Sequence, residues 1–119
     1  MEVTVERGAD GIVYVTYPTE MDEETITRYL INLEKELKNS PAKAKILTDT
    51  TKCKTVEHAL IKKIADGVAP LKIYIEKSAI IISGVFQKAA ADLIFLVSKR
   101  FDIKAFNNRD DALTWLNEK

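Results

Sequence analysis

The fold is decided by the stretch KSAIIISGVFQKAAADLIFLV, which covers residues 77–97. Its first half contains AIIIS at residues 79–83, a run of β-branched side chains that predicts a buried strand. Ser83 and Gly84 then lead into a segment, from about residue 85 to residue 99, whose apolar side chains recur at helical spacing. A buried strand that passes directly into an amphipathic helix is the repeating unit of a parallel α/β sheet. The stretch therefore predicts an α/β protein.

Segments on both sides of this stretch also have the composition of strands. Residues 44–49, AKILTD, form a second buried run. Near the N-terminus, the turn sequence GADG at residues 8–11 separates two β-branched segments, which predict an antiparallel hairpin. The predicted strands are residues 3–5, 12–17, 44–49, 79–83 and 103–106.

Helical periodicity fills the intervals between these strands. The first helix is expected after Thr19, which begins the capping-box sequence TEMD, and it should end before Pro41. Thr55 is expected to cap a second helix that stops near Gly67, and Asn108 is expected to cap the last one. The apolar stripe of the first helix consists of Ile26, Tyr29, Leu30, Leu33 and Leu37.

Residues 71–76, LKIYIE, fit two kinds of structure. They alternate like a strand, yet they directly precede the stronger strand at residues 79–83. Lys77 and Ser78 would make a poor turn between two strands, so we predict a helix for residues 71–76.

The predicted fold is a two-layer α/β domain with a five-stranded mixed sheet. The N-terminal hairpin is antiparallel, and each following βα unit adds a parallel strand beside the previous one. With right-handed crossovers and strands in sequential order, every helix falls on the same face of the sheet. The opposite face is then left to water, the turn of the first hairpin or a partner. All 119 residues are expected to form one domain.

Composition excludes several classes of protein. Of the 119 residues, 46% are hydrophobic and 30% are charged, which excludes a disordered chain. Cys53 is the single cysteine and His58 the single histidine, so disulfides and zinc sites with two imidazoles are excluded. We interpret Cys53 as a structural thiol and His58 as a surface or capping residue. No catalytic residue, cofactor or metal is expected.

Charge bears on partners and on location. The formal net charge is zero, which gives no general affinity for nucleic acid. Glu2 and Glu6 stand where a secretory signal needs basic and apolar residues. Polar and charged side chains interrupt the most apolar region, residues 78–97, which argues against a membrane span. We therefore expect a cytoplasmic protein.

Three loops are expected to meet at the carboxyl edge of the sheet, where open α/β sheets tend to bind ligands. They carry hydroxyls, lysines and a glycine in front of helices, and the third is residues 107–109. Residues 42–119 hold fourteen basic and nine acidic side chains, so positive charge is in excess there. Such loops suit a phosphate or carboxylate, although capping and solvation of an ordinary sheet edge explain the same residues. The candidate anion or ligand site consists of Thr50, Thr51, Lys52, Lys54, Thr55, Ser83, Gly84 and Lys88.

The helix expected from about residue 85 to residue 99 has more apolar surface than packing on a sheet requires. Phe95 and Leu96 lie off its core stripe and should face a neighbouring helix, a ligand cavity or another subunit. Two-fold self-association is the commonest way to cover such a surface, so we predict a homodimer with Phe95 and Leu96 as the candidate interface. The core stripe consists of Phe86, Ala89, Ala90, Leu93, Ile94 and Val97.

Two segments resemble the SpoIIAA-like or STAS-like domain family, whose superfamily also includes Sec14-type lipid-binding folds. Residues 77–97 look like the central strand and following helix of small bacterial members, and residues 106–118, FNNRDDALTWLNE, resemble their ending. In anti-sigma-factor antagonists of this superfamily, a serine in an Asp-Ser-Ser-Gly-like stretch is phosphorylated. The corresponding residues 52–57, KCKTVE, contain no serine or glycine, and Thr55 is the nearest hydroxyl.

The resemblance implies regulatory, partner-binding or small-ligand-binding work rather than catalysis. We therefore expect a non-enzymatic, STAS-like regulatory or protein-interaction module of the cytoplasm. The alternative is a carrier or sensor for a small anionic or amphipathic, lipid-like ligand. The two differ in what the purified protein retains, a second protein chain or a small molecule.

Overall fold

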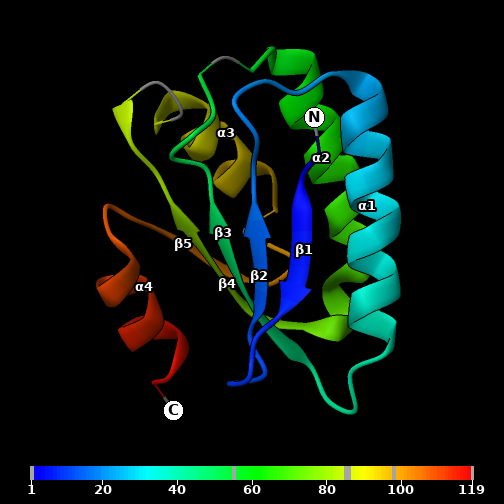
Figure 1. The fold of residues 1–119 in the computed structure, drawn as a ribbon, viewed down its shortest axis with the longest axis vertical. Helices are drawn as coiled ribbons and strands as arrows, with labels where there is room; N and C mark the ends of the chain where they lie inside the picture. The colour runs from blue at the N-terminus through cyan, green and yellow to red at the C-terminus, as the bar shows by residue number, and fades with distance from the viewer. Residues whose placement is uncertain (1, 55, 85–86, 98, 119) are drawn as a thin grey trace.

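The strands lie in the sheet in the order of the sequence (Figure 1). The computed structural model describes residues 2–54, 56–84, 87–97 and 99–118. β1 pairs antiparallel with β2, whereas β2 with β3, β3 with β4 and β4 with β5 are parallel pairs. The predicted mixed sheet, with an N-terminal hairpin followed by parallel βα units, is confirmed. The strands are β1 (Thr4–Arg7), β2 (Val13–Thr16), β3 (Ala44–Asp49), β4 (Ile75–Ile81) and β5 (Asp102–Phe106).

Helices connect the parallel strands and follow the last one. One helix joins β2 to β3, a helix with a 3₁₀ extension joins β3 to β4, and another joins β4 to β5. This is the alternation of strand and helix that the sequence predicts. The helices are α1 (Glu23–Lys38), α2 (His58–Val68), the 3₁₀ helix η1 (Ala69–Tyr74), α3 (Gln87–Val97) and α4 (Arg109–Leu116).

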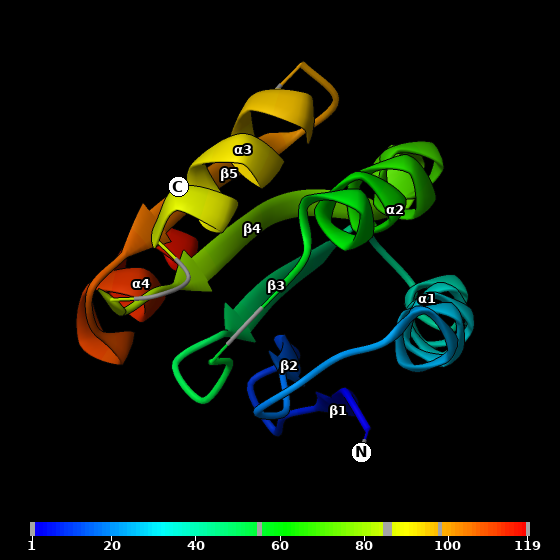
Figure 2. The same ribbon diagram turned by 90° about the horizontal axis from the view of Figure 1, so that it is seen from above.

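α4 packs on the face of the sheet opposite to α1, α2 and α3 (Figure 2). The helices lie mainly on one face, as predicted, but the expectation that every helix shares that face is wrong for α4. α1, α2 and α3 each link two parallel strands, so the handedness of the crossover decides their face. α4 follows the last strand of the sheet and is not bound by that rule. It covers the second face, where Leu47, Ala79 and Ile81 are buried beneath it.

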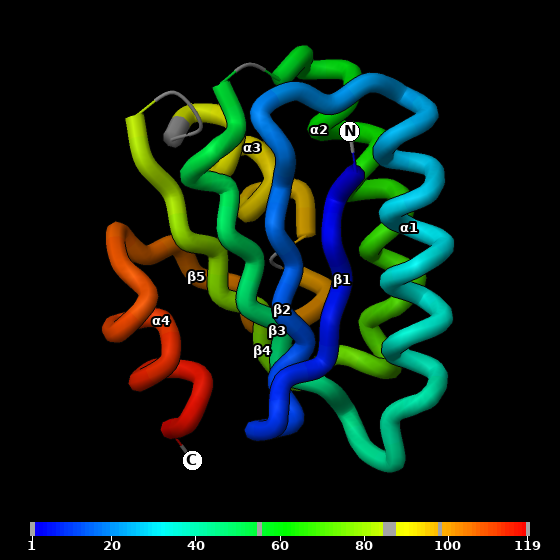
Figure 3. Tube along the Cα trace, viewed as in Figure 1, coloured from blue at the N-terminus to red at the C-terminus, as the bar shows by residue number. Residues whose placement is uncertain are grey.

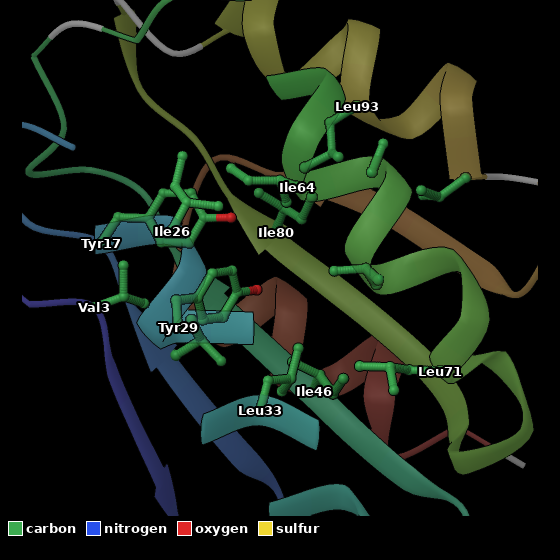
Figure 4. Packing of buried hydrophobic residues seen from close by; sticks show 14 of the residues in the cluster. Val3, Tyr17, Ile26, Tyr29, Leu33, Ile46, Ile64, Leu71, Ile80 and Leu93 are labelled. Atoms are coloured by element: carbon green, nitrogen blue, oxygen red, sulfur yellow. The ribbon is translucent and has the colours of Figure 1, made fainter. Parts of the chain in front are cut away.

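The main core lies between the sheet and α1, α2 and α3 (Figure 4). Alternate residues of the strands point into it, for example Ile46 of β3 and Ile80 of β4. The rings of Tyr17 and Tyr29 meet edge to face, with their centroids 5.8 Å apart. Leu33 is 1% exposed and continues the buried stripe of α1.

The N-cap of α1 lies three residues after its predicted position. Asp22, expected as the third residue of a capping box, is itself the N-cap, so the assignment of Thr19 as the cap is wrong. The Asp22 carboxylate accepts hydrogen bonds from the Thr25 backbone N–H at 2.8 Å and the Thr25 hydroxyl at 2.7 Å. These bonds lower the pKa of Asp22 below its usual value. The predicted apolar stripe is confirmed, with Ile26, Tyr29, Leu33 and Leu37 buried and Leu30 half-buried.

Residues 71–76 do not form a single helix. The 3₁₀ helix η1 ends at Tyr74, and β4 begins at Ile75, four residues before the predicted strand. β4 extends this far because its N-terminal end finds partners on both sides: Ile75 pairs with Ala44 of β3, and Lys77 pairs with Asp102 of β5. Pairing with neighbouring strands thus overrides the local preference of this segment.

α2 begins later than predicted and ends where the sequence predicts. It begins at His58 with Glu57 in the N-cap position, while Thr55, the predicted cap, lies outside the described residues. It ends at Val68, one residue beyond Gly67, so Gly67 is part of its last turn. A Cβ atom at this position would clash with Cδ1 of Leu30, so the glycine allows α1 and α2 to pack closely.

α3 runs from residue 87 to residue 97. The predicted helix also includes residues 85, 86 and 98, which lie outside the described residues. Its buried side chains are Ala90, Leu93 and Val97, and Ala89 and Ile94 are half-buried, in agreement with the predicted stripe. None of the helices in the described ranges has the length and apolar character that crossing a bilayer requires.

Candidate functional site

A groove of about 410 Å³ separates the N-terminal halves of α2 and α3. It lies at the edge of the sheet where β3 and β4 end, because both strands run in the same direction into the loops that precede these helices (Figure 3). This is the edge at which the sequence predicts a ligand site. The residues that line this α2–α3 groove are Lys54, Val56, His58, Ile61, Lys88, Ala89 and Asp92.

The groove has an apolar floor and charged walls. Ile61 is 1% exposed, and Val56 and Ala89 pack partly against the main core. The side chains of Lys54 and Lys88 are exposed and come from opposite sides of the groove. Two ammonium groups beside apolar surface suit a carboxylate or phosphate that is attached to an apolar group.

His58 and Asp92 face each other across the groove. The distance from His58 Nδ1 to Asp92 Oδ2 is 3.7 Å, and both side chains keep contact with solvent. The interpretation of His58 as a surface or capping residue did not foresee its contact with Asp92. The predicted topology could have indicated this contact, because α2 and α3 are successive crossover helices and their first turns lie side by side.

Two residues of the predicted site, Thr50 and Thr51, make hydrogen bonds that hold their own loop. Thr50 is buried, and its hydroxyl donates to the Ile81 carbonyl at 2.7 Å, which ties the end of β3 to the end of β4. Thr51 donates from its backbone N–H and from its hydroxyl to Oδ1 of Asp49, at 2.9 and 2.6 Å. These hydroxyls stabilise the loop and do not line the groove.

The other predicted site residues do not form one cluster. Lys52 is exposed but does not line the groove, and Ser83 and Gly84 are exposed beyond the end of β4. Thr55 lies outside the described residues. The structure thus brings Lys54 and Lys88 together, with His58 and Asp92 between them. Whether they bind an anion stays a prediction.

The third loop does not reach the groove. Because α4 crosses to the other face, Arg109 turns toward Tyr14 of β2 and Asp49 at the end of β3. Its guanidinium carbon lies 5.6 Å from the centroid of the Tyr14 ring, and a guanidinium nitrogen lies 3.7 Å from Oδ2 of Asp49. Residues 107–109 therefore do not line the α2–α3 groove, although the ends of β4 and β5 are joined by the hydrogen bond from Ile82 N–H to the Phe106 carbonyl, and Arg109 approaches Asp49 at the end of β3.

Two apolar side chains of α3 that lie off its buried stripe are exposed to solvent. Phe95 is 80% exposed, and Leu96 is 43% exposed. Leu96 lies one turn after Asp92, on the side of α3 that is turned toward α2, whereas Phe95 lies on the outer side with Lys88 and Ala91. Both residues of the candidate interface are therefore accessible beside the α2–α3 groove.

The described residues contain no group of three or more His, Cys, Asp or Glu side chains that could hold a metal ion. Cys53 is 4% exposed and packs in the main core.

Two solved structures share this architecture. One is a protein of the DUF3478 family with a SpoIIAA-like fold from Shewanella loihica PV-4, with a TM-score of 0.69 and 22% identity over 96% of this chain and 91% of that one. The other is an anti-sigma-factor antagonist (STAS) domain protein from Planctomyces limnophilus, with a TM-score of 0.69 and 11% identity over 99% of this chain and 100% of that one. Comparison with protein-family models and with curated proteins gives no match. The sheet order, the flanking helices and these two likenesses lead to one conclusion: the chain has the SpoIIAA-like fold, which it shares with a STAS domain.

Proposed function

We propose that the protein is a non-enzymatic regulatory or protein-interaction module of the cytoplasm that acts through the exposed face of α3. The observation that carries the proposal is the 80% exposure of Phe95 beside the α2–α3 groove. A large aromatic side chain in water gains stability when a partner covers it, and such residues dominate the energy of interfaces. The likeness to a STAS domain protein supports the same class of function.

The first partner that we propose is a second copy of the chain. Lys88, Ala91 and Phe95 are exposed and follow one another at helical spacing on the outer side of α3. In an antiparallel pair of α3 helices related by a two-fold axis, the Phe95 ring of each copy would lie over the small side chain of Ala91 in the other. A two-fold interface of this kind is self-complementary and closed.

The second candidate function is binding of a small anionic ligand in the α2–α3 groove. Lys54 and Lys88 favour it, and the apolar floor would accommodate the remainder of an amphipathic ligand. A lipid-like cargo enclosed within the domain has less support, because the pocket in the main core measures about 30 Å³. Pockets for larger organic ligands are typically on the order of 300–1,000 Å³. The α2–α3 groove, of about 410 Å³, reaches that range but lies open at the surface.

Native mass spectrometry of the freshly purified protein tests the two candidates together. Self-association through α3 predicts a species of twice the chain mass and no additional small mass. A carrier or sensor predicts a monomer with a retained small molecule that is released on denaturation. A bare monomer at every concentration would contradict the proposed dimer.

The anion-binding candidate makes a prediction about inorganic phosphate. The double variant Lys54→Ala/Lys88→Ala should bind phosphate roughly tenfold more weakly, a loss of about 1.4 kcal/mol, because exposed charge pairs contribute roughly 0.2–1 kcal/mol each. Isothermal titration calorimetry measures the change. Lys52→Ala is the matched control, because Lys52 is an exposed lysine of the same loop that does not line the groove. Equal affinities of the control and the double variant would place any anion outside the groove.

A further inference from the structure

The main core contains a small cavity that is partly open to solvent and has hydroxyl groups on its walls. It measures about 30 Å³, and its lining includes Tyr17, Tyr29, Thr48 and Ser78 among apolar side chains of α2, α3 and the sheet. Figure 4 shows the hydroxyl oxygens of Tyr17 and Tyr29 both pointing away from α1, toward Ile64 and Ile80. Polar groups from α1 and from several strands therefore converge on one point beneath α2 and α3.

The tyrosine hydroxyls are neutral and hydrogen-bonded to each other. Burial raises the pKa of Tyr17 well above its ordinary value and raises that of Tyr29 to about 12. No Lys, Arg, Asp, Glu or His side chain is among the described residues that line the cavity. The walls therefore offer hydrogen bonds but no charge to balance an ion.

Thr48 and Ser78 place two buried hydroxyl groups at the cavity. They are 5% and 7% exposed and lie on the adjacent strands β3 and β4, on the face that points into the main core. Within the described residues, neither hydroxyl makes a hydrogen bond to another group of the protein. Among the described residues, every side-chain oxygen or nitrogen that is fully inaccessible to solvent has a hydrogen-bond partner. The hydroxyls of Thr48 and Ser78 therefore keep some accessible surface, which faces the cavity.

We propose that this cavity is a binding site for one or two ordered water molecules, which hydrogen-bond to the hydroxyls of Thr48 and Ser78. Buried hydroxyls without a partner are rare in folded proteins, and ordered water is their usual partner. A polar cavity needs about 10–15 Å³ to hold one water molecule, which the volume of about 30 Å³ satisfies. An ion is disfavoured by the uncharged walls and an organic ligand by the volume. The site does not depend on the proposed function.

Oxygen-17 relaxation dispersion of water tests the site, because it counts water molecules that stay in a protein far longer than those at its surface. The double variant Thr48→Val/Ser78→Ala should hold one or two fewer long-lived water molecules than the wild type. Ser83→Ala is the matched control, since this serine is exposed. It should leave the count unchanged. Equal counts in the double variant and the control would overturn the proposal.

A second measurement tests the site even if the double variant does not fold. Thr48→Val alone replaces the hydroxyl by a methyl group of nearly the same size, so the cavity keeps its shape. In the wild type, nuclear Overhauser effects should connect water to protons of Thr48 and Ser78, and these effects should weaken or disappear in Thr48→Val. Absence of such effects in the folded wild type would show that the cavity is dry and the proposal wrong.

Discussion

Phe95→Glu is expected to convert the proposed dimer into a folded monomer. Phe95 is 80% exposed in the single chain, so the substitution removes no side chain from the domain core. In the dimer, the glutamate would place an unpaired charge in an apolar seam. Loss of a large aromatic residue at the centre of an interface typically costs 2 kcal/mol or more, which is a dissociation constant raised by roughly 30-fold or more. Sedimentation equilibrium measures the constant, and circular dichroism checks the fold.

The control for Phe95→Glu is Ile31→Glu. Ile31 is another large apolar side chain, 59% exposed, but it lies on α1. Its replacement should leave the dissociation constant unchanged. If Ile31→Glu dissociates the dimer and Phe95→Glu does not, the contact lies on α1 and the assignment to α3 is wrong.

Leu96→Glu separates the interface from the domain core. Leu96 is 43% exposed, so part of its side chain packs within the single chain. A monomer that remains folded would place Leu96 in the seam with Phe95, whereas a variant that unfolds would place it in the core. A folded dimer would exclude it from the contact.

The second large effect is expected at Leu116→Ala, on the face of the sheet that α4 covers. Leu116 is 0% exposed and packs with Leu47, Ala79 and Ile81. Truncation of a buried leucine to alanine typically costs about 2–5 kcal/mol, through lost apolar burial and the cavity that remains. A domain of this size is stable by roughly 5–15 kcal/mol, so a large share of the stability would be lost. Urea unfolding measures the free-energy difference.

Leu113→Ala provides the comparison for Leu116→Ala. Leu113 lies on the same helix but is only partly buried against the same cluster, so its truncation should cost less. Losses that are equal for the two variants, or below about 1 kcal/mol for Leu116→Ala, would contradict the docking of α4 on the second face.

The sheet could be predicted from the sequence because its strands and helices have clear periods. AKILTD at β3 is a short buried run, and the stripe of α1 repeats at three- and four-residue spacing. Short connections between such elements leave few topologies, and the sequential parallel order follows from them. Local pattern and global fold agree in these segments.

Three features depended on tertiary structure and could not be predicted locally. The face covered by α4 is decided by Leu47, Ala79 and Ile81, which are distant in sequence from Leu116. The start of β4 at Ile75 depends on partners in β3 and β5. The close approach of Gly67 to Leu30 depends on how α1 and α2 pack together.

The candidate site could be predicted only in its location. The carboxyl edge of the sheet follows from the topology, and the groove there contains two of the predicted residues, Lys54 and Lys88. The sequence does not reveal that Thr50 and Thr51 hydrogen-bond within the loop. It also does not reveal that Asp92 approaches His58, since that contact depends on how two helices pack side by side.

Hydrogen–deuterium exchange of the wild-type protein at increasing concentration tests self-association through α3, because it reports both whether the chain associates with itself and where. Exchange should slow as concentration rises, and the slowing should be confined to α3 and to the adjoining first turns of α2. Slowing at the edge strands β1 or β5, or along α1, would contradict the assignment to α3. Exchange that is independent of concentration throughout the chain would contradict self-association itself.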